Sequence, residues 1–582
     1  MAALFLLLLL NSMLLISSLP HSLGNRLSYH HHQQELLLQF KAALSKNDAS
    51  LPDWTTLHHF CNWSAITCHL NSHSVRAINL TQMSLDGTIS PVLGNLSSLR
   101  SLDLSNNNLT GTIPLQLGQL PNLWILLLHY NQLQGTIPPA LSACRNLYDL
   151  RLSFNQLHGI IPPELSLLTN LKYLYLGINS LTGTIPPSFK NLTALVELDL
   201  GPIPPELGML TRLQNFNLFE NNLSGTIPSS LTNLSNLIML GLTLNRLSGQ
   251  IPWEIGKLSN LQFLSSWGNQ LSGNIPHSLG NCSSLEVLVL NDNPLGGEVP
   301  MELGKLNHLT LLFLHTNQLV TDTSNTLAFL TALTNCSHLQ QIDMGRNHFT
   351  GTLPPSIGQL SFNLYHLGLQ FNMISGSIPQ QIVNLTNLTY LGLHNLLSGH
   401  IPSGIKRFRV LEILMLGGNK LEGNIPGEIG QMQHLGLLNL SYNQLSGKIP
   451  DSLCHSQQLR RLFLHHKKLS EKVPVSLEGC QKLELLDLSH NKLGGLIPRE
   501  VIASLKNLQL YLNLSWNYLE GSLSLEMSKI VMAQAIDISG NQLTGVIPNS
   551  LGDCTALEHL NLSHNAFVGP IPDSLSKLKN IQ

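Results

Sequence analysis

The side chains with types and spacing suited to chemistry are few in this chain. Glu197 and Asp199 share one face of an extended segment and could act as an acid/base pair. No cleft is indicated around them, so solvated strand residues are the better interpretation. His30, His31 and His32 could bind a metal, but we expect an unstructured linker there.

Sequence motifs of known catalytic and nucleotide-binding sites are absent from the chain. It has no GxxxxGK[ST], HExxH, GxSxG or GxGxxG, and no kinase HRD or DFG. The sequence therefore predicts no enzyme, no cofactor and no metal centre. Lys and Arg number 31 against 33 Asp and Glu, which argues against a nucleic-acid partner because phosphate binding needs a basic surface.

The N-terminus is almost wholly apolar from Ala2 to Ile16 and is followed by small and turn residues. This pattern predicts a secretory signal peptide over residues 1–24, cleaved between Ser17 and Gly24. An uncleaved anchor is the alternative. No later apolar run reaches membrane length, so we expect no span after the signal, and an oxidising compartment for the mature chain.

One repeat explains almost all of the remaining chain. The run LRSLDLSNNNLTGTIP, residues 99–114, defines the template LxxLxLxxNxLxGxIP, which returns mostly every 24 residues. By count there are 21 LxL centres, from Ile78–Leu80 to Leu560–Leu562. Their leucines alternate with variable residues, which predicts short strands with leucines inward.

The template asparagine predicts a buried polar ladder, because its amide can both donate and accept hydrogen bonds to turn backbone. Eighteen of the 21 repeats keep it. Met83 and Lys467 replace it in two repeats, and one repeat lacks the segment. The template glycine permits an unusual turn, and the proline ends strand pairing on the outer side.

This pattern resembles leucine-rich repeats of the plant-specific type, over residues 76–582. The resemblance implies an α/β repeat solenoid: a leucine-rich-repeat superhelix with a parallel β-sheet on its concave face. Short 3₁₀ or irregular segments would form the convex face. We expect about 21 repeats, of which the last is incomplete.

Residues 25–75 resemble the N-terminal cap of such repeats, which carries a Cys pair around a Trp. Here these residues are Cys61, Trp63 and Cys68. The resemblance implies a Cys61–Cys68 disulfide; a metal site, the other interpretation, lacks further ligand pairs.

The other six cysteines share one repeat position that is elsewhere leucine, so we expect them free and buried. They are Cys144, Cys282, Cys336, Cys454, Cys480 and Cys554.

Two repeats depart from the regular step. The step at Leu200–Gly201 is only 18 residues, either a sequence artefact or a real local fault. Between Leu312 and Ile342 the step is 30 residues. The inserted VTDTSNTLAFLTAL resembles an insertion in plant immune receptor kinases of the elongation factor Tu receptor group. It predicts a longer convex helix whose Leu327, Phe329, Leu330 and Leu333 face the core.

Aromatic residues are enriched on the predicted concave face in the first half of the chain. Exposed aromatics on a rigid sheet are typical peptide anchors, so we predict a ligand-binding surface there. His366 adds a polar group. The predicted ligand-binding residues are Tyr130, Phe154, Tyr173, Tyr175, Phe219, Phe263, Trp267, Phe313, His315, Arg346, Phe371 and Tyr390.

A second candidate surface is basic and rich in histidine, and could dock a partner in a pH-sensitive way. It comprises Arg461, His465, His466 and His490.

Fourteen Asn-x-Ser/Thr sequons predict glycosylation of a secreted chain. They lie at Asn62, Asn79, Asn95, Asn108, Asn191, Asn222, Asn233, Asn281, Asn335, Asn384, Asn387, Asn439, Asn513 and Asn561.

The resemblance implies an extracellular ligand-recognition module of a plant receptor-like protein or kinase. Such a module would bind a peptide or microbial protein, for defence or developmental signalling, and act with a co-receptor kinase. A secreted inhibitor of a microbial cell-wall-degrading enzyme, of the polygalacturonase-inhibitor type, is the alternative. Such inhibitors have about ten repeats rather than 21, so the length of this chain favours the receptor. The chain ends partway into a repeat at Gln582, which suggests a fragment of a longer receptor; a nonfunctional truncated receptor product is a further alternative.

Overall fold

The computed structural model describes residues 21–44, 51–182, 186–199, 203, 205–220, 224–321, 326–578 and 581. Three predictions lie outside these residues: most of the signal peptide, the Leu200–Gly201 junction and the Asn222 sequon. The chain forms two compact units. Unit 1 is Met1–Leu261 with Gly268–Gln270, and unit 2 is Gln262–Trp267 with Leu271–Gln582.

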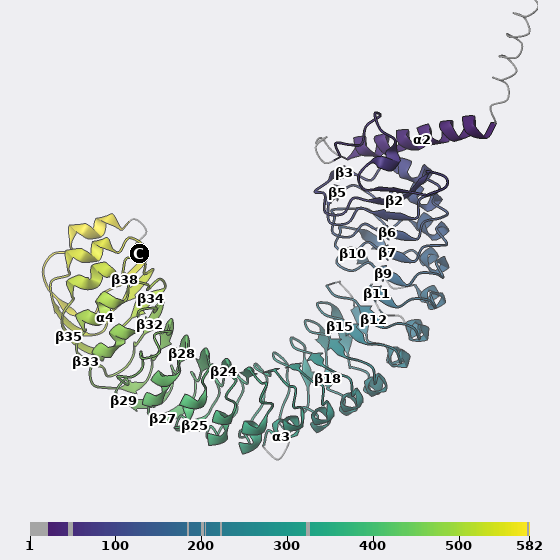
Figure 1. Ribbon diagram of the computed structural model, residues 1–582. Helices are drawn as coiled ribbons and strands as arrows, with labels where there is room; N and C mark the ends of the chain where they lie inside the picture. Colours follow the sequence, from purple (N-terminus) through teal and green to yellow (C-terminus); the bar gives the residue numbers. More distant parts are fainter. Residues whose placement is uncertain are drawn as a thin grey trace, which may run out of the picture. The chain divides into compact units, whose positions relative to one another are not determined.

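Each coil contributes one short strand to a parallel ladder, as Figure 1 shows for β6, β7 and β9. Adjacent strands align template position with template position; Leu126 pairs with Leu150, and Leu150 with Leu174. These central leucines are fully buried, while the residues on either side of them face away from the core. The LxL pattern therefore sets the register of the ladder, as predicted.

The described ladder strands number 21, one for each predicted LxL centre. In unit 1 they are β2 (Val75–Asn79), β4 (Ser101–Asp103), β6 (Ile125–Leu127), β7 (Asp149–Arg151), β9 (Tyr173–Tyr175), β11 (Glu197–Asp199), β12 (Asn215–Asn217) and β14 (Met239–Gly241). In unit 2 they are β16 (Phe263–Ser265), β19 (Val287–Val289), β21 (Leu311–Phe313), β22 (Gln341–Asp343), β23 (His366–Gly368), β24 (Tyr390–Gly392), β26 (Ile413–Met415), β28 (Leu437–Asn439), β30 (Arg461–Phe463), β32 (Leu485–Asp487), β34 (Tyr511–Asn513), β36 (Ala535–Asp537) and β38 (His559–Asn561).

Shorter strands after the ladder asparagine form small parallel sheets beside the main ladder. They are β3 (Asp86–Thr88), β5 (Asn108–Thr110), β8 (His158–Ile160), β10 (Ser180–Thr182), β13 (Ser224–Thr226), β15 (Arg246–Gly249), β17 (Gln270–Leu271), β18 (Gly273–Asn274), β20 (Leu295–Gly296), β25 (Ser398–Gly399), β27 (Lys420–Asn424), β29 (Gln444–Gly447), β31 (Lys468–Leu469), β33 (Gly494–Leu496), β35 (Tyr518–Ser522), β37 (Gln542–Gly545) and β39 (Ala566–Phe567).

The other side of most coils carries a short helix, usually 3₁₀, as the resemblance implied; residues 451–456 form turns instead. In unit 1, after η1 of the cap (Phe60–Asn62), these are η2 (Pro91–Asn95), η3 (Leu115–Gln119), η4 (Pro139–Ala143), η5 (Pro163–Leu167), η6 (Pro187–Asn191), η7 (Pro205–Met209), η8 (Ser229–Asn233) and η9 (Trp253–Lys257). In unit 2 they are η10 (His277–Asn281), η11 (Met301–Lys305), α3 (Ala328–Ala332), η12 (Leu333–Asn335), η13 (Pro355–Gln359), η14 (Gln380–Asn384), η15 (Ile405–Arg407), η16 (Gly427–Gln431), η17 (Val475–Gly479), α4 (Arg499–Ser504), η18 (Leu525–Lys529), η19 (Asn549–Asp553) and η20 (Asp573–Lys577).

At Gly118 these helices leave little room for a side chain. A Cβ atom added to Gly118 would lie 2.3 Å from the backbone oxygen of Ala140 in the next coil. Any larger residue there would push two neighbouring coils apart.

The asparagine ladder has the role that the sequence predicted. Asn317 is buried, and its Nδ2 donates to the carbonyl oxygens of Leu314 at 3.0 Å and of Leu290, in the preceding coil, at 3.1 Å. Its Oδ1 accepts from the backbone N–H of Leu295 at 3.1 Å. One side chain thus satisfies buried backbone groups of two coils, which explains why the template retains it.

Lys467 replaces the ladder asparagine in one coil of unit 2. The side chain is buried, and its Nζ donates to the carbonyl oxygen of Leu440 in the preceding coil. Burial lowers the pKa of the Lys467 amine well below its ordinary value, against the attraction of Asp487, which raises it. A lysine has no acceptor, so it cannot reproduce the bond that Asn Oδ1 makes to the preceding coil.

Both irregular steps fit the ladder. Across the 18-residue step, β11 pairs in register with β12, Glu197 opposite Asn215. The inserted segment of unit 2 forms α3 followed by η12, as predicted. The four residues expected to face the core are all buried: Leu327, Phe329, Leu330 and Leu333.

The N-terminal cap consists of helix α2 (His21–Ala43) and the antiparallel pair of β1 (Ile66–Cys68) with β2. The expectation of an unstructured linker at His30–His32 was wrong, because α2 runs through these residues. Their stretch is continuous with the apolar segment of α2, where Leu36, Leu37 and Phe40 are buried.

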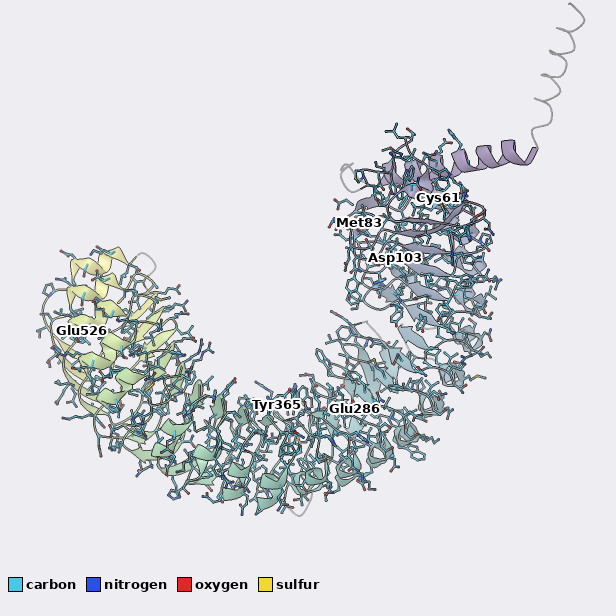
Figure 2. The ribbon with its side chains drawn as sticks, viewed as in Figure 1. Cys61, Met83, Asp103, Glu286, Tyr365 and Glu526 are labelled. Atoms are coloured by element: carbon cyan, nitrogen blue, oxygen red, sulfur yellow. A yellow bond between two sulfur atoms is a disulfide. The ribbon has the colours of Figure 1, made fainter. Side chains whose placement is uncertain are left out.

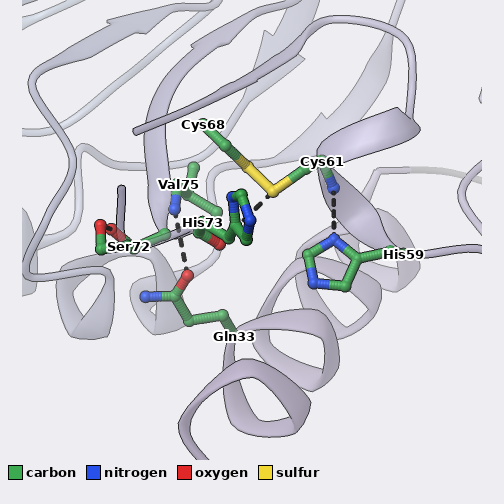
Figure 3. Close-up of a disulfide and its surroundings, with 8 residues drawn as sticks. Gln33, His59, Cys61, Cys68, Ser72, His73 and Val75 are labelled. Atoms are coloured by element: carbon green, nitrogen blue, oxygen red, sulfur yellow. Dashed lines mark hydrogen bonds between the residues drawn. A yellow bond between two sulfur atoms is a disulfide. The ribbon is translucent and has the colours of Figure 1, made fainter. Parts of the chain in front are cut away.

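The predicted Cys61–Cys68 disulfide is present in the cap, with Cα atoms 5.6 Å apart (Figures 2 and 3). His59 Nδ1 accepts from the backbone N–H of Cys61 at 3.2 Å. Buried Gln33 of α2 accepts from the backbone N–H of Val75 at 3.1 Å, which ties the helix to the first ladder strand.

One cysteine prediction was wrong: Cys454 and Cys480 form a second disulfide, with Cα atoms 4.9 Å apart. They occupy equivalent positions in adjacent coils, and adjacent coils stack at a distance that a disulfide can bridge. The other four are free and buried as expected: Cys144, Cys282, Cys336 and Cys554.

Among the described residues, no helix has the length and apolar character needed to cross a membrane. The same residues contain no group of three His, Cys, Asp or Glu side chains placed to hold a metal ion.

Candidate functional site

The residues flanking each buried strand leucine form one surface of the ladder in each unit. We call this surface the strand face; it corresponds to the concave face expected from the sequence. Because neighbouring strands align in register, equivalent side chains of successive coils lie in rows. The carboxylates Glu197 and Asp199 belong to β11 of this face, but their side chains lie outside the described part of the chain.

Arg151 organises the strand face of unit 1. Its guanidinium carbon lies 4.7 Å from the ring centroid of Tyr175 and 5.9 Å from that of Tyr173, both on the neighbouring strand β9. Its Nε donates to Asp149 Oδ1 at 2.9 Å and to Oδ2 at 3.1 Å. Asp149 is largely buried, so the charged pair holds the guanidinium between two half-exposed rings.

A second row of cation–aromatic contacts lies just before these strands. Lys172 Nζ is 5.0 Å from the ring centroid of Tyr148, and Arg100 lies 5.7 Å from that of Trp124. Tyr148 also meets Tyr173 edge to face at 5.3 Å. We call the set Trp124, Tyr148, Arg151, Tyr173 and Tyr175 the arginine–tyrosine patch.

Tyr130 and Phe154 form a separate aromatic pair on unit 1. Their rings stack at 3.9 Å with an interplanar angle of 17°, and both are exposed. Beside them, burial lowers the pKa of His129; Asp103 and Asp149 raise it, whereas Arg151 lowers it. His129 is therefore neutral over most of the physiological range.

On unit 2, His366 and Tyr390 stack at 4.3 Å with nearly parallel rings. His366 Nε2 lies 3.6 Å from Asp343 Oδ2. Burial raises the pKa of the Tyr390 hydroxyl, and the negative charge of Asp343 raises it further. Tyr365, labelled in Figure 2, accepts a hydrogen bond from Gln341 on the same face.

Four further predicted residues of unit 2 are Phe313, His315, Arg346 and Phe371. The guanidinium of Arg346 lies 4.8 Å from the ring centroid of Phe371, whose other neighbour is the His394 ring at 4.6 Å. Phe313 and His315 lie 6.2 Å apart. These residues of unit 2 therefore form three small clusters: His366 with Tyr390, Arg346 with Phe371 and His394, and Phe313 with His315.

The predicted ligand-binding residues from Tyr173 to Phe313 are divided between the two units. Phe219 lies in unit 1, and Phe263 and Trp267 in unit 2. Trp267 and Tyr175 are both half-buried.

The sequence prediction missed Trp124, Tyr148, Arg151 and Asp149 of unit 1. A signal for the first two was available, since Arg100, Trp124, Tyr148 and Lys172 recur every 24 residues at one template position. That position precedes the strand and was not counted as part of the surface. Nothing in the repeat indicated how Arg151 would be oriented.

The predicted basic and histidine-rich row is split in the structure. Arg461 and Arg460 line a hollow of about 520 Å³, where both approach Glu484, at 3.7 and 3.0 Å. His465 and His466 follow the C-terminal end of β30, and His490 follows that of β32, whereas Arg461 begins β30.

Most predicted glycosylation sites are exposed. Six end a 3₁₀ helix, on the side of the coil opposite the strand face: Asn95, Asn191, Asn233, Asn281, Asn335 and Asn384. Asn439 and Asn513 are half-buried on the strand face, and each accepts hydrogen bonds from the serine of its own sequon. Their occupancy stays a prediction, as does that of the other described sequons.

Residues 30–69 match the leucine rich repeat N-terminal domain, residues 145–201 match a leucine rich repeat model, and ten further segments between 98 and 578 match single repeats. The receptor kinase-like protein Xa21 of Oryza sativa subsp. japonica is 49% identical over 67 residues, 12% of this chain and 6% of that protein. The LRR receptor-like serine/threonine-protein kinase EFR of Arabidopsis thaliana is 44% identical over 72 residues, 12% of this chain and 7% of that protein. These alignments span less than a tenth of either relative.

A solved structure matches almost the whole chain. It is the Arabidopsis receptor kinase HAESA in complex with the peptide hormone IDA and the co-receptor SERK1. The TM-score is 0.76 at 34% identity, covering 93% of this chain and 95% of that one.

Proposed function

Because this chain belongs to the leucine-rich-repeat family of plant receptor ectodomains, we propose that it is the extracellular ligand-recognition module of a receptor-like protein or receptor kinase. It binds a peptide or a microbial protein on its strand face and serves defence or developmental signalling. It reaches the cell exterior through the secretory pathway, and a co-receptor kinase completes the signalling complex.

The observation that carries this proposal is the arginine–tyrosine patch. Asp149 holds Arg151 through two contacts, so little side-chain entropy is lost when a ligand binds to the guanidinium. The tyrosine rings beside it offer large, rigid contact area with a polar tip. Rings with an ordered cation suit an extended peptide better than a small apolar molecule, which needs an enclosed pocket.

The co-receptor is proposed from the likeness to HAESA, whose structure contains both a peptide hormone and SERK1. Its test is separate: a co-receptor ectodomain should associate with this chain only when ligand is present. Association without ligand would argue against this arrangement.

The test of ligand binding is selection of a displayed random dodecapeptide library on the purified chain. We expect enriched peptides whose binding falls about thirtyfold or more in Arg151→Ala or Tyr173→Ala, the loss typical of a central interface residue. Tyr173→Ala should unfold at nearly the wild-type temperature, since its side chain lies on the surface, whereas Arg151→Ala leaves the buried carboxylate of Asp149 without its partner and should unfold at a lower temperature.

Trp253→Ala is the matched control. Trp253 is an equally large aromatic, 72% exposed, but it lies on η9 away from the strand face. Its removal should leave peptide binding unchanged. Peptides that lose affinity in Trp253→Ala but not in Arg151→Ala would overturn the assignment of the strand face.

A further inference from the structure

Four aromatic rings from four successive coils of unit 2 form a stack along one row of the strand face. Tyr442 lies 4.3 Å from His466, and His466 lies 4.1 Å from His490, with interplanar angles of 22° and 26°. Trp516 follows at 5.9 Å from His490, nearly parallel to it. We call Tyr442, His466, His490 and Trp516 the histidine stack.

Trp516 makes one more ring contact beyond the stack, and the glycine at position 540 in the intervening coil makes this contact possible. A Cβ atom on Gly540 would lie 2.8 Å from the Trp516 ring, so the indole occupies the space above this glycine. The backbone of Gly540 has φ of +64°, which glycine adopts without strain. Trp516 therefore also approaches His564, two coils away, at 5.9 Å.

The acidic groups near the stack are already engaged. Asp487 is buried and accepts from Ser489 Oγ at 2.7 Å, with His465 Nδ1 at 3.1 Å and the Tyr511 hydroxyl at 3.5 Å. Glu484 is held by Arg460 and Arg461. Among the described residues, no carboxylate lies within 4 Å of a ring nitrogen of His466 or His490.

We propose that the histidine stack is a second docking surface, which binds an acidic peptide segment and takes up protons when it does so. The observation is charge complementarity: two adjacent imidazoles lack a carboxylate partner and are flanked by rings that stabilise a cation. This surface is distinct from the arginine–tyrosine patch, so the proposal does not depend on the ligand path proposed above.

Proton uptake follows from the packing of the stack. Two imidazolium rings 4.1 Å apart repel each other. Burial lowers the pKa of His466; His490, His465 and Lys467 lower it further, and Asp487 raises it. A carboxylate placed over both rings offsets this repulsion, so binding of the acidic segment favours the protonated form of His466 and is accompanied by proton uptake.

The experiment uses the full chain and a hexaglutamate peptide as the probe. Calorimetric titration at pH 5.5 should show at least about tenfold tighter binding than at pH 7.5. Titrations at pH 6 in two buffers with different ionisation enthalpies should show net proton uptake. A hexalysine peptide should bind more weakly than hexaglutamate at pH 5.5.

The variant His466→Gln with His490→Gln should lose both the tighter binding and the proton uptake. Its control is His348→Gln with His400→Gln, which removes the same number of histidines at exposed positions outside the stack. Retained pH dependence in the first variant, or its equal loss in the second, would overturn the proposal. If the first variant fails to unfold cooperatively, two single variants replace it: His466→Gln, and Trp516→Phe, which keeps an aromatic ring. Unchanged proton uptake in both single variants would count against the proposal.

Discussion

Cys454 and Cys480 are bonded across adjacent coils, and the chain segment that they enclose contains Lys467, the one lysine in the asparagine ladder. The disulfide joins coils at the place where the ladder has lost one of its connections. In a repeat protein each coil contacts only its neighbours, so a local weakness is not offset elsewhere. We interpret the bond as a compensating link between these coils.

The first prediction concerns this bond. Thiol counting after denaturation without reductant should give four thiols, because Cys61, Cys68, Cys454 and Cys480 are all bonded. Replacing Cys454 and Cys480 together by alanine should lower the free energy of unfolding by about 2–4 kcal/mol. Cys554→Ala is the control for loss of a buried sulfur alone. A count of six thiols would contradict the second disulfide.

The second prediction is that Lys467→Asn stabilises the protein by about 1–3 kcal/mol. An asparagine restores an acceptor for the preceding coil and removes a buried amine whose charged form is disfavoured. Thermal unfolding measures the gain. Lys468→Asn, at the exposed neighbouring position, should change little. A lower unfolding temperature in Lys467→Asn than in the wild type would show that Lys467 stabilises its coil.

The third prediction tests the ladder itself. Asn317→Ala should cost about 3 kcal/mol or more, because it leaves several buried backbone groups of two coils without partners. Asn260→Ala removes one exposed bond to Ser235 O and should cost less than about 1 kcal/mol. Denaturant unfolding of both variants decides the comparison. Equal losses would mean that the ladder adds nothing beyond ordinary hydrogen bonds.

The fourth prediction is a fall in folding stability as the solution is acidified. Burial lowers the pKa of His129, His394 and His466 below the ordinary histidine value. The unfolded chain then binds more protons than the folded one. The stability that depends on these three neutral histidines is therefore fully present above about pH 6.5, and it is lost as the pH falls through their pKa values in the folded chain. Urea unfolding at pH 7.5 and 5.5 measures this loss. Replacing all three histidines by glutamine should reduce the pH dependence.

The sequence by itself determined the coil, its register and the asparagine ladder. The reason is that a 24-residue period places equivalent residues of neighbouring coils side by side, so one template predicts every strand. The sequence also contained the information needed to predict the second disulfide. Cys454 and Cys480 are one coil apart in the same frame, whereas Cys282 and Cys336 are two coils apart, too far for a bond.

Only the tertiary structure decided how the outward side chains combine. The period predicts which residues face solvent but not which rotamers they adopt, since solvent leaves several open. The placement of Arg151 between Tyr173 and Tyr175 depends on the buried carboxylate of Asp149. The reach of Trp516 to His564 depends on the missing side chain of Gly540. Such contacts depend on the particular side chains of two or three successive coils, which a single repeat template does not encode.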